Sequence, residues 1–121
     1  MHDLTMGAVE SRFAQLIWDN APITAASLAK LANQALGWKK TTAYTALKRL
    51  CEKGIFRNEG GTVTVLISPE EFRAGQSRRF LQETCGGSIP IFLTAFTSKG
   101  QLSTKDLADI RKMLDDYEKE V

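Results

Sequence analysis

The chain has 121 residues, of which 43% are hydrophobic and 25% are charged. These values exclude a disordered chain, and the length suits one compact domain or a small binding unit with a helical extension. The formal net charge of +2 is too small to indicate a partner, so the distribution of charge along the chain must be considered.

Two helices are predicted in the first 36 residues. Apolar residues at helical spacing from Met6 to Trp18 predict the first helix, and Pro22 ends it. Thr24 is the predicted N-cap of the second helix, and Gly37 is expected to close it. Its expected buried stripe consists of Leu28, Leu31, Ala32, Ala35 and Leu36.

The third predicted helix follows after a very short turn. Lys39, Lys40 and Thr41 compete for its N-cap, and only Thr41 has a side chain that caps well. Gly54 supplies the left-handed residue that ends the helix. The expected buried stripe is Ala43, Ala46, Leu47, Leu50 and Cys51. The opposite face carries hydroxyls and long cations, so the second and third helices are predicted to form a helix-turn-helix.

Charge is concentrated around this predicted motif. Residues 30–57 contain seven cations and one acid, a local charge of +6, whereas residues 101–121 contain four cations and six acids, a local charge of −2. A DNA phosphate backbone would be attracted to the first segment and not to the second.

Two β-rich runs, residues 55–58 and 62–67, lie on either side of Glu59-Gly60-Gly61 and predict a hairpin. Three helices followed by a hairpin make a winged helix, so residues 1–68 are the predicted winged-helix DNA-binding domain. The alternative is an edge hairpin that only covers the core.

Residues 69–121 are predicted to form a three-helix dimerisation region, which makes the expected fold mainly α. Ser68, Ser88 and Ser103 are the expected N-caps. A unit of about 50 residues buries an apolar segment poorly, and a second copy would cover it. The residues expected in this interface are Leu81, Ile89, Phe92, Leu93, Phe96, Leu107, Ile110 and Leu114. The alternative is that these helices fold back on the N-terminal domain.

Several motifs occur in a characteristic order. They are Glu10-x-x-Phe13-Ala14-x-x-Ile17-Trp18, Gly37-Trp38, Thr42-Ala43-x-Thr45-x-Leu47-x-Arg49-Leu50-x-x-Lys53-Gly54, Phe80-Leu81, Gly86-Gly87-Ser88, Phe92-Leu93-x-x-Phe96 and Leu102-Ser103-x-x-Asp106-Leu107. Over nearly its whole length the chain resembles the penicillinase-repressor family of winged-helix repressors.

The resemblance implies a homodimeric transcriptional repressor that reads a dyad-symmetric operator in the major groove and controls β-lactam resistance or a related stress response. In such relatives a membrane sensor protease leads to a cut between Asn and Phe in the dimerisation region. The matching pair here is Ala95-Phe96, a departure from that pattern that counts against release by the same cut. The C-terminal cysteine motif of the copper-responsive branch does not occur in this sequence.

Eight residues of the third helix and its start are candidates for DNA contacts. The expected phosphate contacts are Lys39, Lys40 and Lys48. The expected base contacts are Thr41, Thr42, Tyr44 and Thr45. Solvated lysines and a phosphate-binding Thr42 are the alternatives. Arg49 is expected either to contact a phosphate or to pair with Glu10 on the first helix.

Other function classes receive little support. The sequence contains no candidate catalytic triad, phosphate-binding glycine loop or paired carboxylates in an apolar setting, so we do not expect an enzyme. His2 is the single histidine, and we expect no metal site and no cofactor. Cys51 is expected to be a small core residue. The sequence has two cysteines, and it shows no signal peptide and no apolar run of membrane length. We therefore expect a cytoplasmic protein without direct membrane binding. A winged-helix module that binds protein remains the alternative.

Overall fold

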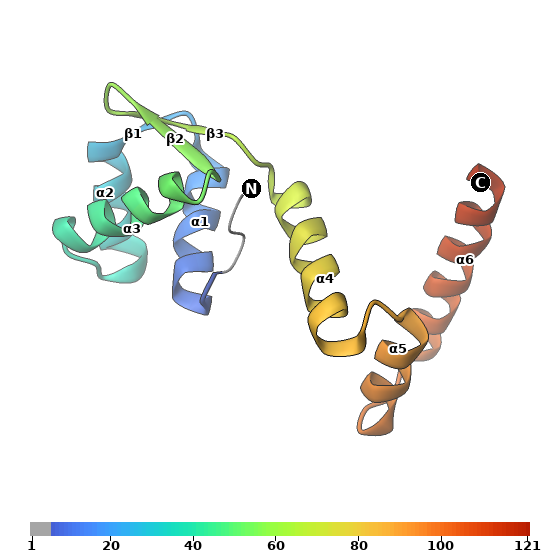
Figure 1. The fold of residues 1–121 in the computed structure, drawn as a ribbon. Helices are drawn as coiled ribbons and strands as arrows, with labels where there is room; N and C mark the ends of the chain where they lie inside the picture. The colour runs from blue at the N-terminus through green and yellow to red at the C-terminus, as the bar shows by residue number, and fades with distance from the viewer. Residues whose placement is uncertain (1–5) are drawn as a thin grey trace. The chain divides into compact units, whose positions relative to one another are not determined.

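The computed structural model describes residues 6–121, so His2 lies outside the described residues. The backbone forms two compact units, Met1–Arg79 and Phe80–Val121 (Figure 1). The elements are α1 Ala8–Asn20, β1 Ile23–Thr24, α2 Ala25–Leu36, α3 Lys40–Glu52, β2 Phe56–Glu59, β3 Thr62–Val65, α4 Pro69–Cys85, α5 Ile89–Ser98 and α6 Thr104–Glu120. The predicted fold class, mainly helical with a small winged-helix sheet, is confirmed. None of the helices described for residues 6–121 is both long enough and apolar enough to cross a lipid bilayer.

The core of the first unit lies where α1, α2, α3 and the sheet meet. Its fully buried members include Phe13 and Ile17 from α1, Leu28 from α2 and Leu50 from α3. Burying such a side chain contributes roughly 1.5–3 kcal/mol each, which holds the three helices together. The predicted stripe of α3 is confirmed, with Ala43, Leu47 and Leu50 buried and Ala46 and Cys51 half-buried.

The predicted stripe of α2 is partly wrong. The buried residues are Ala25, Leu28, Ala29 and Ala32. Leu36 is half-buried and packs at the edge of the core, Leu31 is half-buried, and Ala35 is exposed. The face turned toward α1 and α3 is therefore the alanine-rich one, because small side chains let these helices approach closely.

The helix boundaries around the predicted helix-turn-helix follow the chain's own capping groups. The Ser27 amide donates to the Thr24 hydroxyl at 3.1 Å, and Gly37 closes α2 with a φ of 69°, as predicted. Of the three candidates for the N-cap of α3, Lys39, Lys40 and Thr41, the structure uses the first, although only Thr41 has a side chain that caps well. Lys39 is the N-cap, in extended conformation and without a capping side chain, because the short turn after Gly37 starts the helix one residue before Thr41.

The sheet has three antiparallel strands in the order β1-β3-β2. The hairpin is confirmed, with Phe56 opposite Val65 and Glu59 opposite Thr62. Its strands run over 56–59 and 62–65, not 55–58 and 62–67, because the Ile55 carbonyl accepts bonds from the amides of both Leu66 and Ile67 outside the ladder. β1 was not predicted; it pairs Ile23 with Val63.

Trp18 fixes the chain where it leaves the wing. Its indole N–H donates to the Ile67 carbonyl at 2.9 Å, and its ring lies 5.5 Å from the rings of both Phe56 and Phe72. Phe72 is in the first turns of α4, so this start of α4 belongs to the first unit. The Ser68–Glu71 capping box at this helix start is confirmed by bonds of 3.1 and 3.3 Å.

The second unit is helical and leaves most of its apolar side chains exposed. Ser88 caps α5, and Ser103 with Asp106 forms a capping box at α6, as predicted. Cys85 is the one buried residue in 80–121. Ile89, Phe96 and Leu114 are 60%, 53% and 59% exposed, so this unit does not bury its own apolar surface. The division into a DNA-binding domain over 1–68 and a dimerisation region over 69–121 stays a prediction.

Candidate nucleic-acid interface

The eight residues proposed for DNA contacts all lie on the exposed side of α3 and its N-cap. They are Lys39, Lys40, Thr41, Thr42, Tyr44, Thr45, Lys48 and Arg49. The buried residues Ala43, Leu47 and Leu50 occupy the other side of the same helix and anchor it to the core. The helix is therefore held from one side and presents hydroxyls, cations and one aromatic ring on the other.

The start of α3 carries positive charge without compensation. Its first turn contains no acidic residue, and Lys39 provides no side-chain cap for the free amides. These amides form the positive end of the helix dipole, which favours an anion. The Lys40 ammonium lies 5.9 Å from the centre of the Tyr44 ring, so a cation and an aromatic ring lie together on one side of the start of α3.

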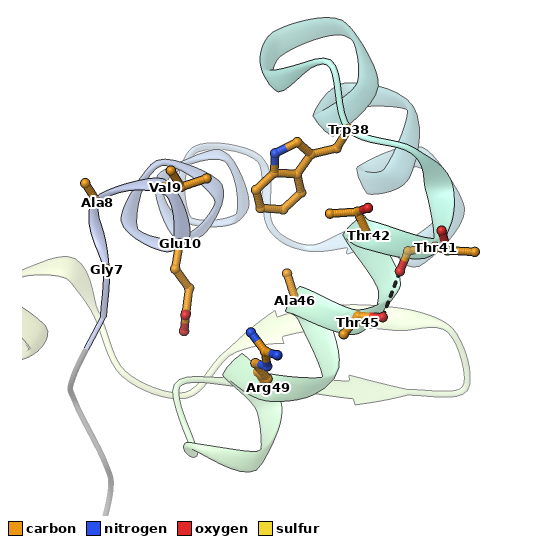
Figure 2. Close-up of a pocket in the computed structure, with 10 residues that line it drawn as sticks. All are labelled: Gly7, Ala8, Val9, Glu10, Trp38, Thr41, Thr42, Thr45, Ala46 and Arg49. Atoms are coloured by element: carbon orange, nitrogen blue, oxygen red, sulfur yellow. Dashed lines mark hydrogen bonds between the residues drawn. The ribbon is translucent and has the colours of Figure 1, made fainter.

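A hollow of about 620 Å³ separates the start of α1 from α3. Figure 2 shows the Trp38 indole projecting between the two helices, with Glu10 and Arg49 further along the hollow. The α3 residues that line it are Thr41, Thr42, Thr45, Ala46 and Arg49, and α1 with its N-cap contributes Gly7, Ala8, Val9 and Glu10. One flank of the exposed α3 surface is thus a mixed apolar and polar trough.

Of the two roles considered for Arg49, the structure does not show the ion pair with Glu10. The Glu10 carboxylate accepts instead from the Lys53 ammonium at 2.8 Å, and both side chains are about four-fifths buried. Within residues 6–121 Arg49 forms no ion pair. The Arg49 guanidinium therefore keeps its charge and its donors for another partner, and its contact with a phosphate stays a prediction.

The hydroxyl groups on α3 differ in what they offer. The Thr45 hydroxyl donates to the Thr41 carbonyl at 2.9 Å, the bond drawn in Figure 2. Its proton is used within the helix, which leaves an acceptor oxygen and a methyl group facing outward. An acceptor suits the amino group of adenine or cytosine, and a methyl group suits the methyl of thymine.

Cys51 closes the core behind this surface. It is half-buried and packs against the core, as predicted. Burial raises the pKa of the Cys51 thiol, a backbone hydrogen bond at Asn58 opposes the rise, and the nearby Glu52 charge adds a smaller increase. The thiol is therefore held protonated, which is the opposite of what a reactive thiolate requires.

The sequence model of one family, described as penicillinase repressor, matches residues 6–116. The chain belongs to the penicillinase repressor family. This is a family of DNA-binding transcriptional regulators and not of enzymes. The resemblance suggested by the sequence motifs is confirmed. A comparison with curated proteins gives no match.

Sequence reasoning gave no structural role to two residues that shape this member of the penicillinase repressor family. The Trp38 ring lies 4.9 Å from the Phe13 ring and forms one wall of the hollow. The side-chain amide of Asn33 donates from Nδ2 to the backbone carbonyl of Trp38 at 3.0 Å and fixes the turn between α2 and α3. The asparagine four residues before Gly37 was the available signal, because short polar side chains near a helix end often bond to the backbone beyond it.

Proposed function

We propose that the chain is a homodimeric repressor that binds a dyad-symmetric operator by inserting α3 into the major groove. The observation that carries the proposal is the outward face of α3, which combines an uncapped, acid-free start with exposed lysines and threonines. Lys39, Lys40 and Lys48 contact phosphates, while the threonines and Tyr44 contact base edges. A repressor must reach its operator, so we infer that the chain is cytoplasmic.

The dimeric state is supported by the apolar surface of the second unit. Of the predicted interface residues, Ile89, Phe96, Leu107 and Leu114 are exposed, and Leu81, Phe92, Leu93 and Ile110 are half-buried. Phe80, Phe92 and Phe96 form a chain of ring contacts at 6.1 and 6.0 Å. Such a surface is too apolar to remain in water, and a two-fold partner also matches the symmetry of a palindromic operator.

A second candidate concerns the way the repressor is released. Relatives in β-lactam resistance are released after a membrane sensor protease leads to a cut between Asn and Phe, whereas this chain has Ala95 before Phe96. Ala95 lies within α5, and its carbonyl accepts from the Ser98 hydroxyl at 2.8 Å. Alanine in place of asparagine at position 95 favours an inducer that acts without this cut. The remaining alternative is that the winged helix binds a protein.

The test of the proposed function is the salt dependence of binding to the DNA upstream of the chain's own gene. Replacing Lys39 and Lys40 by alanine removes two cations that are expected to neutralise phosphates. The slope of log affinity against log salt should then fall by about 0.9 for each phosphate that is no longer neutralised, on specific and nonspecific duplexes alike. An unchanged slope would show that these lysines do not bind phosphate, and a wild-type chain that binds no duplex would refute DNA binding itself.

A further inference from the structure

A second hollow, of about 310 Å³, lies between the outer surface of α2 and the start of α3. Its lining residues are Ala26, Ala29, Lys30, Asn33, Gln34 and Lys40. On α3, Lys40 and the Arg49 of the first hollow are about two and a half turns apart, and therefore point to opposite flanks of the helix. The exposed surface of α3 is thus a ridge with one hollow toward α1 and another toward α2.

The α2-side hollow is positively charged. Lys30 and Lys40 contribute two ammonium groups, and none of the six lining side chains is acidic. Both lysines are exposed, and within residues 6–121 neither forms an ion pair. The α1-side hollow differs in this respect because Glu10 lines it.

The geometry of this hollow is fixed by the turn beneath it. The bond from the Asn33 amide to the Trp38 carbonyl and the left-handed Gly37 set the position of Lys40 relative to α2. The exposed Ala26 presents only a methyl group, so a sugar–phosphate chain can approach the α2 backbone closely there. Gln34 adds a neutral amide whose N–H groups can donate to a phosphate oxygen.

We propose that this hollow binds a backbone phosphate on the DNA strand that borders the major groove on the α2 side. Lys30 and Gln34 are then DNA contacts in addition to Lys40. The inference rests on the proposed function, because a helix lying in a groove about 12 Å wide has a sugar–phosphate strand on each flank. The two hollows match those two strands, and the α2 hollow has the charge that a phosphate requires.

The experiment compares Lys30→Gln with Lys105→Gln in the full chain. Both changes remove one positive charge, and Lys105 is an exposed residue of α6, outside the proposed DNA surface. Binding is measured by fluorescence anisotropy over a range of salt, on the upstream duplex and on a mixed-sequence duplex of equal length. Lys30→Gln should lower the salt slope by about 0.9 and the affinity roughly tenfold at 0.1 M salt on both duplexes, and Lys105→Gln should change neither.

Two further measurements separate the possible outcomes. Gln34→Glu should weaken binding more than Gln34→Ala, because it places a negative charge in the hollow. Phosphate ethylation should identify one phosphate whose modification weakens wild-type binding and leaves Lys30→Gln binding unaffected. A wild-type chain that binds neither duplex would overturn the proposed function. If the wild type binds, and Lys30→Gln leaves both the salt slope of binding and the ethylation pattern unchanged, this inference alone is overturned. Glutamine is a good helix former, so this change at an exposed helical position preserves the fold.

Discussion

Burial decides the chemistry of single residues behind the proposed DNA surface. Cys51 lies on the inner edge of α3, where removal from water raises its pKa more than the hydrogen bond at Asn58 lowers it. A thiol with a raised pKa is neutral over the physiological range and reacts slowly. Cys51 therefore acts as a small packing residue, in agreement with its position on the apolar stripe.

The raised pKa of Cys51 has a defined effect on stability. The folded chain holds the thiol proton more tightly than the unfolded chain, so the stabilisation is complete below the unfolded pKa and is lost as pH rises through the folded pKa. We expect alkylation of Cys51 by iodoacetamide to require a higher pH in the native chain than in the denatured chain, as followed by mass analysis of its peptide. Equal pH profiles in the two states would contradict this expectation.

The partner of Glu10 shows what sequence spacing leaves open at this scale. Arg49 and Lys53 are four residues apart on one side of α3, so either could reach α1. The structure selects Lys53, at 2.8 Å. Helical periodicity predicts which face a side chain occupies, but the choice between two cations on that face depends on the angle between α1 and α3, which only packing sets.

At the scale of elements, the Glu10–Lys53 pair joins the start of α1 to the end of α3. The exposed fractions of its side chains, 21% for Glu10 and 19% for Lys53, place it between surface and buried ion pairs in strength. It holds the two helices that form the walls of the larger hollow. The orientation of α3 relative to α1 therefore depends in part on this contact.

Glu10→Gln removes the charge and keeps the shape of the side chain. We expect the free energy of unfolding to fall by about 1–2 kcal/mol, because the largely buried Lys53 ammonium loses the charge of the Glu10 carboxylate. The control is Asp109→Asn, which breaks the exposed pair with Lys105 at 2.7 Å and should cost less than about 0.5 kcal/mol. Urea unfolding measures both, and an equal decrease in the two variants would show that the Glu10 pair has no special role.

The sequence predicts elements well where periodicity or a cap determines them. The helices, the wing and the caps at Thr24, Ser88 and Ser103 follow from such patterns. The strand β1 has only two residues, Ile23 and Thr24, and therefore carries no alternation to detect. The sequence left the start of α3 open among Lys39, Lys40 and Thr41, because the structure uses Lys39 as the N-cap of this helix, without a capping side chain that a pattern could reveal.

At the scale of the whole molecule, residues 80–121 expose apolar side chains that a second copy would cover in the proposed dimer. Neither α5 nor α6 buries any residue within the chain. Four of the residues that helical spacing predicts for the interface, Ile89, Phe96, Leu107 and Leu114, are exposed, and their place in an interface stays a prediction. The sequence does not place a second copy in the proposed dimer, because an interface depends on the relative position of two whole chains.

Phe96→Asp tests this interface. A carboxylate in an apolar contact should raise the dimer dissociation constant by at least about a hundredfold, as measured by sedimentation equilibrium. Thr94→Asp places the same charge about half a turn away on α5 and should leave the dimer intact. A Phe96→Asp chain that sediments as the wild type does would remove Phe96 from the interface.

In the proposed complex, two copies of α3 read one duplex. Hydroxyl-radical footprinting on the DNA upstream of the chain's own gene, combined with native mass measurement of the complex, tests it directly. We expect two chains per duplex and two protected segments, with centres about 10 base pairs or a multiple of that apart. One chain on a single protected segment, or no protection at any salt concentration, would contradict it.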